Sequence, residues 1–162
     1  MYNTSKLFVL IAVLLLTNIS HAASDSTLDI FKSLAGSWSI QDKVTGKILP
    51  FEMKYELGSR DSIVTEQFGK ELSVFHQDKK DLLMTHYCNR GNQPRLKLLT
   101  GNDPTKIEFE LVDITNLDTP DDPHVQKIVY WVLDSTHLDL EIIWQIGSQV
   151  KSEKYSLTKK IK

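Results

Sequence analysis

The clearest candidates for chemistry are a histidine and a cysteine, His86 and Cys88, which lie two residues apart in one short segment. Side chains at alternate positions of a β-strand point to the same side of a sheet. An imidazole and a thiol would therefore lie next to each other. Leu82 and Met84 share this side, while Leu83, Thr85 and Tyr87 share the other; if the first side faces the interior, a polar histidine and a thiol lie inside it. Such a pair suits ligand binding, metal binding or thiol chemistry.

A polar ligand-binding cluster is the first of these interpretations. Arg95 follows on the next predicted strand, and Glu66 lies two strands earlier, on the same side of its strand as Val64 and Phe68. Arg95 and His86 would hold a carboxylate or another anionic head group by charge-assisted hydrogen bonds. The cluster would then form the polar end of an apolar cavity.

A structural network is the alternative interpretation of the same residues. His86 and Arg95 would bond to the backbone of the polar loop at residues 89–94, because buried polar groups need partners whether or not a ligand is bound. Asn92 and Gln93 suit this role, since these residue types commonly bond to the backbone in turns.

Metal and enzyme sites are further alternatives. His86 and Cys88 are both possible ligands of zinc or copper, and His76 or His124 would complete a set. Cys88 beside His86 would also permit an activated thiolate, although a lone cysteine is commonly a small buried apolar residue. Only two of the metal ligands have a defined relative geometry. We therefore favour a protein with no bound metal, no cofactor and no catalytic residues.

Aromatic and apolar residues supply the body of the predicted pocket. We expect Phe51, Met53, Trp131 and Trp144 to contact the apolar part of a small apolar or amphipathic ligand. Trp131 shares one side of its strand with Lys127, so both would point inward unless a β-bulge intervenes. A structural or partner-binding envelope protein with a packed interior is the competing interpretation.

Period-two alternation predicts the elements that would position these residues. One short helix is expected over 28–34, where Leu28, Phe31 and Leu34 share a face, and it ends near Gly36. The expected strands begin at Gly36 and then cover 51–57, 60–68, 72–76, 82–88, 95–100, 107–111, 125–133, 138–146 and 152–158.

Many candidate strands joined mostly by short turns predict an all-β fold. Short connections make neighbouring strands antiparallel. A long meander hides its edges most completely by closing, so we predict a closed up-and-down β-barrel of about 8–10 strands after the short helix. A β-sandwich is the competing all-β arrangement, but it usually needs longer connections between strands.

The start of the chain predicts export. Residues 1–22 have the layout of a secretory signal peptide, with one positive charge, an apolar run over residues 7–16, and small side chains at Ser20 and Ala22. The run is short, because about 20 apolar residues are needed to cross a bilayer. Cleavage after Ala22, or one residue later, would leave residues 23–162 as one barrel domain without a transmembrane segment. We expect the protein to be periplasmic or secreted.

The composition limits the partners. The full chain has 162 residues, with 19 Lys and Arg against 21 Asp and Glu, which gives a formal net charge of −2. No basic excess marks a nucleic-acid partner, so we expect none. The single cysteine excludes an intramolecular disulfide and a cysteine-based zinc finger, because each needs at least two thiols. A domain of this size must therefore be stabilised by its apolar core.

The first predicted strand carries a resemblance to a known fold family. Gly36-Ser37-Trp38 follows the short helix, and Thr45-Gly46-Lys47 comes next. This order resembles the Gly-x-Trp opening of lipocalins and their calycin relatives, and it implies that Trp38 closes the bottom of a calycin-type barrel. Some calycin barrels bind haem through a histidine late in the chain. The last histidine here, His137, lies at a predicted hairpin tip, which argues against haem.

A second resemblance covers nearly all of the chain after residue 22. The residues that carry it are Thr85, His86, Tyr87, Cys88, Gly91, Asn92, Gln93, Pro94 and Arg95, with Thr115, Asn116, Leu117, His124 and Trp144 downstream. This pattern is similar to that of a family of bacterial exported lipocalin-like proteins. The resemblance implies a calycin-type β-barrel and an envelope location, but no particular substrate or reaction.

Overall fold

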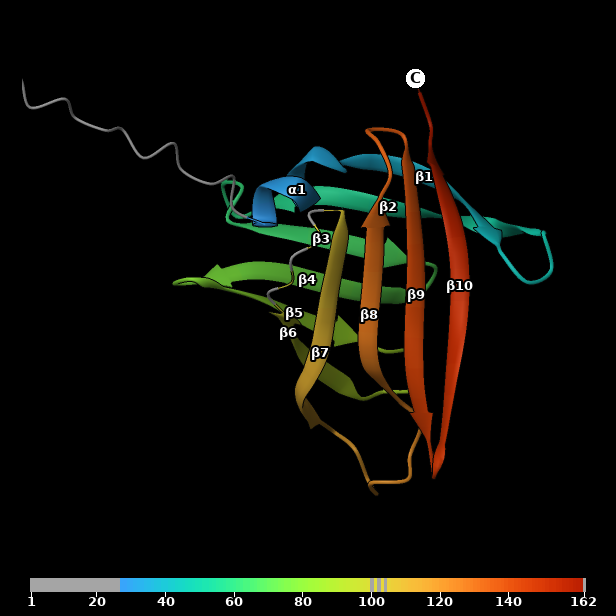
Figure 1. Cartoon of the computed structure of the whole chain (residues 1–162). Coiled ribbons are helices and arrows are strands. Elements are labelled where there is room, and N and C mark those ends of the chain that lie inside the picture. Colours follow the sequence, from blue (N-terminus) through green and yellow to red (C-terminus); the bar gives the residue numbers. More distant parts are fainter. Residues whose placement is uncertain (1–26, 100, 102, 104, 162) are drawn as a thin grey trace, which may run out of the picture.

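Ten antiparallel strands form one closed barrel, which confirms the predicted all-β up-and-down fold over the sandwich (Figure 1). The computed structural model describes residues 27–99, 101, 103 and 105–161, so the predicted signal peptide lies outside the described residues. The elements in chain order are α1 (Thr27–Ser33), β1 (Gly36–Asp42), β2 (Ile48–Gly58), β3 (Ile63–Phe68), β4 (Glu71–Asp78), β5 (Asp81–Tyr87), β6 (Gln93–Leu99), β7 (Lys106–Thr115), β8 (His124–Val132), β9 (His137–Ile146) and β10 (Gln149–Lys159).

The first and last strands close the barrel. Each strand pairs with the next one along the chain, and β1 pairs with both β2 and β10. Trp38 of β1 lies opposite Met53 on one side and Lys159 on the other. The ring of strands therefore has no unpaired edge, which removes the site where another chain could add a strand.

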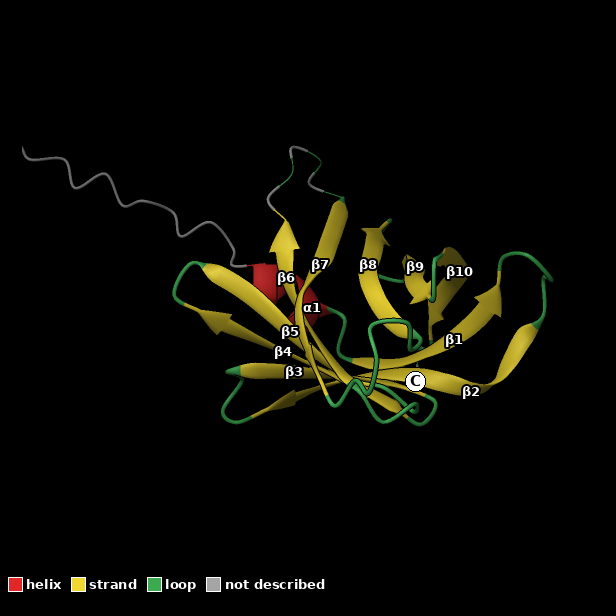
Figure 2. Ribbon diagram, turned by 90° about the horizontal axis from the view of Figure 1, so that it is seen from below, coloured by secondary structure: helices red, strands yellow, loops and turns green. Residues whose placement is uncertain are grey.

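The two ends of the barrel differ. α1 contacts β2, β3 and β4 and covers the end that carries the β2–β3, β4–β5 and β8–β9 turns, which we call the plugged end. The opposite end, which we call the open end, is formed by residues 43–47, 69–70, 88–92, 116–123 and 147–148. The β1–β2 turn projects from the barrel on the side away from α1 (Figures 1 and 2).

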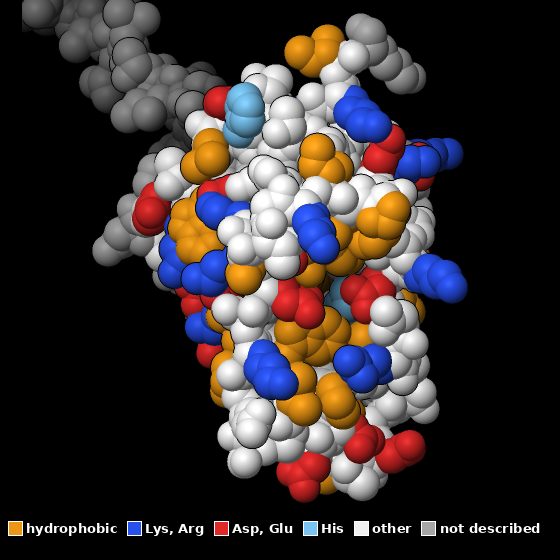
Figure 3. Space-filling view, turned by 90° about the vertical axis from the view of Figure 1, so that its right-hand side faces the viewer, with side chains coloured by type: hydrophobic (Ala, Val, Ile, Leu, Met, Phe, Trp, Pro, Cys, Tyr) orange, Lys and Arg blue, Asp and Glu red, His pale blue; other side chains and the backbone are white. Residues whose placement is uncertain are grey.

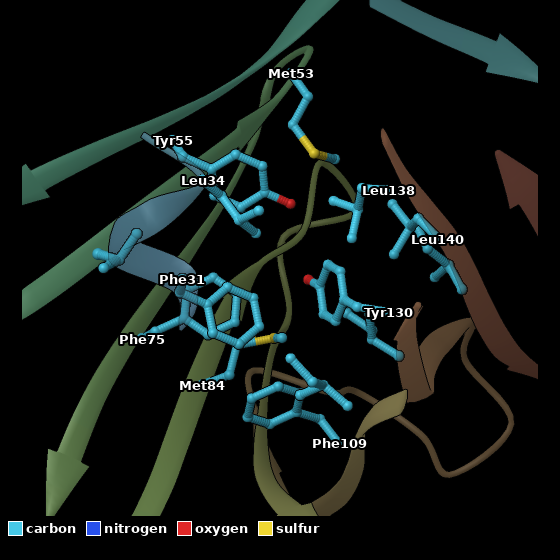
Figure 4. Packing of buried hydrophobic residues seen from close by; sticks show 14 of the residues in the cluster. Phe31, Leu34, Met53, Tyr55, Phe75, Met84, Phe109, Tyr130, Leu138 and Leu140 are labelled. Atoms are coloured by element: carbon cyan, nitrogen blue, oxygen red, sulfur yellow. The ribbon is translucent and has the colours of Figure 1, made fainter. Parts of the chain in front are cut away.

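Phe31 of α1 fills the interior near the plugged end. Its ring stacks on Phe75 with centroids 4.2 Å apart, and it meets Tyr130 and Phe109 edge-on at 5.2 and 5.9 Å. Figure 4 shows Phe31 surrounded by side chains from several strands. Aromatic contacts of this kind add to the free energy gained by apolar burial. The helix is therefore a plug, and this part of the interior is packed.

Trp38 is fully buried at the same end. Its indole Nε1 donates a hydrogen bond of 2.8 Å to the carbonyl oxygen of Leu34, which ties the chain after α1 to β1. The ammonium group of Lys159 lies over the indole ring, 5.4 Å from its centroid. Trp38 thus occupies the base of the barrel, the position that the Gly-x-Trp resemblance implied.

β2 follows the predicted alternation over its middle only. Met53 and Tyr55 are fully buried, but Phe51 is 38% exposed. The β2–β3 ladder begins at Met53, which lies opposite Phe68, so Phe51 extends beyond the last residue of β3. Phe51 therefore belongs to the rim of the open end, and its predicted contact with a ligand stays a prediction. Met53 is a core residue.

None of the helices in the described part of the chain is both long and apolar enough to span a membrane.

Candidate functional site

A buried carboxyl group lies in the middle of the barrel. Glu66 of β3 accepts hydrogen bonds at Oε2 from the hydroxyl groups of Tyr55, at 2.7 Å, and Tyr130, at 2.8 Å. The hydroxyl of Ser73 lies 3.3 Å from Oε1 as a third donor. Burial raises the pKa of Glu66, and the three donors act in the opposite direction. Figure 4 shows the two tyrosine hydroxyls turned toward the same part of the interior.

His86 continues this line of polar contacts toward the open end. Its Nδ1 lies 3.1 Å from Ser73 Oγ, and its Nε2 lies 3.8 Å from Glu71 Oε2. Because the single hydroxyl proton of Ser73 goes to Glu66, the network assigns the proton of His86 to Nδ1. Nε2 then carries a lone pair, and it is buried without a hydrogen-bond partner. Burial lowers the pKa of His86 to about 4, so the imidazole is neutral near pH 7.

Glu71 and Cys88 meet where β4 begins and β5 ends. The thiol donates to Glu71 Oε1 at 3.7 Å, and the backbone amide of Asn89 donates to the same oxygen at 3.4 Å. Burial raises the pKa of the Glu71 carboxyl and that of the Cys88 thiol. A reactive cysteine needs a lowered pKa and a base at its sulfur. The arrangement therefore does not favour the thiol-enzyme interpretation.

Trp144 lies inside the barrel near the open end, as predicted. It is 8% exposed, and its Nε1 donates to Glu153 Oε2 at 3.3 Å. The hydroxyl of Tyr155 donates to the same oxygen at 3.1 Å. The guanidinium of Arg90 lies 5.7 Å from the centroid of the Trp144 ring, within cation–π range. These contacts surround the opening with aromatic faces and charged groups.

A hollow of about 310 Å³ opens beside this cluster, lined in part by Phe51, Phe68, Glu71 and Asn89. The ring of Phe68 lies 5.4 Å from that of Phe51 and 5.3 Å from that of Tyr155, so the three rings form a continuous aromatic wall. Figure 3 views the molecule from the side of the β1–β2 turn. It shows hydrophobic and acidic side chains gathered in the middle of this face, with basic ones around them.

Arg95 does not reach His86, which corrects the predicted head-group clamp. Arg95 pairs with Thr85, whose side chain faces outward, so that Arg95 faces outward as well. Its guanidinium makes two hydrogen bonds to the carboxylate of Asp113 on the outer surface. Arg95 therefore forms an exposed ion pair, and it does not bond to the 89–94 loop either.

Trp131 and Lys127 lie on the outer wall, which corrects the predicted inward position of Trp131. A β-bulge shifts the β8–β9 register between Val125 and Lys127. Val125 points inward, but one extra residue reverses the alternation, so that Ile128 and Tyr130 point inward after it. Trp131 instead lines a separate hollow on the outer surface.

The second half of the motif, from Gly91 onward, forms a structural loop. Asn92 Nδ2 donates to the carbonyl oxygen of Pro123 at 3.0 Å, and Asn116 Nδ2 donates to that of Gly91 at 2.6 Å. Gln93 Nε2 also donates to the Gly91 carbonyl. Gly91 itself has φ +91°, which residues with a Cβ rarely adopt. A structural network therefore exists here, but these amides supply it, and not the predicted histidine and arginine.

The remaining motif residues surround this loop. The side chains of Thr85 and Tyr87 face outward, and Pro94 is buried. Neither His76 nor His124 joins Cys88 as a metal ligand. Within the part of the chain that the structure describes, the group with ligand-like spacing is Glu71, His86 and Cys88.

Glu71 and Ser73 are candidate site residues that the sequence analysis missed. They share the inward face of β4 with Phe75, while Leu72 and Val74 lie on the other face. Alternation assigns the more apolar set to the interior. Here Leu72 and Val74, which point outward, are apolar, whereas Glu71 and Ser73, which point inward, are polar. Alternation therefore does not assign Glu71 and Ser73 to the interior. The register of β4 against β5, which only the structure gives, brings them to His86.

Comparisons with known proteins bear on the fold. No family model and no curated protein matches the chain. Among solved structures, the chain is similar to the crystal structure of Rv2717c from M. tuberculosis, with a TM-score of 0.53 and 14% sequence identity. The alignment covers 83% of this chain and 97% of that one. The likeness concerns the fold, which is a lipocalin-like β-barrel.

Proposed function

We propose that this protein binds a small amphipathic molecule at the open end of its barrel. The observation that carries the proposal is the difference between the two ends. Phe31 fills the plugged end, whereas the open end has a hollow of about 310 Å³ with aromatic walls and a buried polar cluster beside it. Small-molecule sites combine apolar walls with a few convergent polar groups, and the open end has this composition.

The two ends of the ligand would meet different surfaces. Its apolar body would lie against Phe51 and Phe68, where leaving water is favourable. Its polar end would face Glu71 and Asn89. A carboxylate accepts hydrogen bonds, so we expect an amine or hydroxyl at this end of the ligand. Arg95 lies on the outer wall and takes no part in this contact, whereas Lys70 also lines the hollow and would face the ligand with its positive charge.

Binding of the neutral fluorescent probe N-phenyl-1-naphthylamine tests the proposal. We expect saturable binding with a stoichiometry of one, and a fluorescence increase as the probe leaves water. Phe51→Ser should weaken binding roughly tenfold. The substitution removes an aromatic ring, and about half of the surface of this ring would contact the ligand. Leu133→Ser is the matched control, since it removes an exposed apolar side chain from the outer hollow near Trp131.

Two results would contradict the proposal. Absence of saturable binding would favour the competing interpretation, a structural or partner-binding protein with a packed barrel. Loss of binding in Leu133→Ser but not in Phe51→Ser would move the site to the outer wall. Native mass spectrometry of protein purified from its own host would identify a natural ligand by its co-purifying mass.

We also propose that the protein is exported and belongs with the bacterial exported lipocalin-like proteins that its motif resembles. The support is the signal-peptide layout of residues 1–22 and the lipocalin-like barrel that follows.

A further inference from the structure

Three different metal-ligating groups meet at one point of the open end. The ligand atoms of Glu71, His86 and Cys88 all lie within 4.8 Å of one another, and all three residues are buried. A tetrahedral zinc ion holds its nitrogen, oxygen and sulfur ligands roughly 3.3–3.5 Å apart. The separation is 3.8 Å between Nε2 and Oε2, and 3.7 Å between Sγ and Oε1. These two distances involve different oxygens of Glu71, so its carboxylate would have to rotate to bring one oxygen to coordination distance together with Nε2 and Sγ.

The lone pair of His86 provides a second, independent observation. His86 is 3% exposed, and its Nε2 faces the Glu71 carboxylate without a hydrogen-bond partner. The other ring nitrogen is bonded to Ser73, which is in turn bonded to Glu66. Metal-bound histidines are held in this way, with one nitrogen donating to a fixed partner and the other free to coordinate. An orphaned buried nitrogen is otherwise costly.

The charges of the group suit a divalent cation. A carboxylate and a thiolate together carry two negative charges, which a divalent ion would neutralise in the barrel interior. Within the described residues, no lysine or arginine nitrogen lies within 4.0 Å of the Glu71 carboxylate, and the more distant guanidinium of Arg90 acts on Glu71 and Cys88 without a direct ion pair. The backbone amides of Asn89 and Arg90 donate to Glu71 Oε1 and Cys88 Sγ, both at 3.4 Å, and hold these ligands in place.

We propose that Glu71, His86 and Cys88 bind one Zn²⁺ ion, with its fourth position directed at the open-end hollow. Thiolate and imidazole ligands select zinc-like ions over Mg²⁺ and Ca²⁺, which prefer oxygen. On binding, the S–H bond of Cys88 breaks, the sulfur coordinates the ion, and the proton passes to solvent. This site does not depend on the organic ligand proposed above.

Cobalt substitution tests the site, because Cys88 is the only cysteine of the chain. Untagged protein is freed of metal with a chelator, titrated with Co²⁺ and then with Zn²⁺. We expect one equivalent of Co²⁺ to produce a thiolate-to-cobalt charge-transfer absorption, which can come from this residue alone. One equivalent of Zn²⁺ should abolish the absorption, release a proton and raise the melting temperature.

Substitutions distinguish the residues that bind the metal from the residues beside them. Cys88→Ser should remove the charge-transfer band. His86→Gln should weaken Zn²⁺ binding by more than the roughly 10–100-fold that loss of an outer-shell partner costs. Ser73→Ala, at a positioning residue, should cost roughly 10–100-fold and keep one ion per chain. Glu56→Gln is the matched control, because it neutralises an exposed carboxylate of β2 outside the ligand group, and it should leave the affinity unchanged.

Several results would overturn the proposal. They are absence of stoichiometric binding, cobalt binding without a charge-transfer band, and equal affinity in His86→Gln. Binding at exposed pairs such as Asp134 with His137 would lack the band and so would count against the site. If a variant fails to fold by circular dichroism, the wild-type band, proton release and melting shift still decide the outcome.

Discussion

His86 connects the centre of the barrel to its open end. Ser73 lies on one side of the ring and Glu71 on the other, so the imidazole joins the buried Glu66 to the carboxylate at the mouth. A neutral imidazole can do this because it offers one donor and one acceptor. Burial is the reason that it stays neutral, since the charged form would lose its hydration.

We predict that His86 of the metal-free protein titrates near pH 4. An unfolded histidine binds a proton below about pH 6.5. Between these values the unfolded state holds a proton that the folded state lacks. The free energy of unfolding should therefore fall by up to about 3 kcal/mol as the pH is lowered from about 6.5 to about 4. Below about pH 4, His86 should contribute no further loss of stability. Titration of the imidazole resonance by NMR measures the pKa directly.

His86→Gln separates this effect from that of the buried carboxyls. Burial raises the pKa values of Glu66 and Glu71, so the folded state binds their protons first and is stabilised as the pH falls. The two effects oppose each other. The acid-induced loss of stability should be smaller in His86→Gln than in the wild type, measured by urea unfolding at pH 7 and 5. An imidazole resonance with a midpoint near 6.5 would refute the prediction.

The short helix contributes to the fold chiefly through one ring. α1 has seven residues, too few to be stable alone, and its place is set by the burial of Phe31 among aromatic side chains of β4, β7 and β8. The Trp38 indole bonded to the Leu34 carbonyl holds its C-terminal side. Helix and barrel therefore form one packed unit at the plugged end.

Phe31→Ala should destabilise the protein by about 3–5 kcal/mol, because it leaves a cavity in a packed aromatic cluster. Lys32→Ala is the control on the same helix, since it removes a partly exposed ion pair with Asp29 and should cost less than about 0.5 kcal/mol. Urea unfolding followed by fluorescence measures both. Equal stability of the two variants would mean that α1 is not part of the core.

Strand irregularities decided which predicted residues reached the site. One bulge in β8 moved Trp131 from the interior to the outer wall. The shorter partner strand β3 left Phe51 at the rim, where it helps to form the proposed binding surface. Both effects arise where a ladder shifts or ends. The positions of bulges and ladder ends cannot be predicted from the alternation of apolar and polar residues within one strand.

The whole barrel has one packed end and one end with a polar cluster. Closure by β1 and β10 removes every sheet edge, and the plug covers one mouth. The proposed ligand and metal sites consequently share the opposite mouth.

We predict that a bacterial host exports the protein and removes its leader. Mass spectrometry of the mature chain should give an N-terminus at Ala23 or Ser24, and fractionation should place the protein in the periplasm or medium. Ala22→Arg combined with Ala23→Arg should block cleavage at both sites, because the peptidase accepts small side chains, whereas Asn18→Gln should not. An uncleaved protein in the membrane fraction would contradict the prediction.

The sequence by itself determined the class of fold. Period-two alternation, short turns and the helix before Gly36 were sufficient for a closed meander, because each of these signals is local. It also placed His86 beside Cys88 on one side of their strand, and Glu66 on the same side as Val64 and Phe68, and the structure shows that both sides face the interior.

Only the tertiary structure decided which polar groups meet. Glu71 lies beside His86 and Cys88 because the register of β4 against β5 brings them together, and its own strand has an apolar outward face that concealed it. Arg95, by contrast, pairs with an outward residue and is excluded from the interior. Contacts between residues far apart in the chain depend on register and closure, and these are properties of the complete barrel.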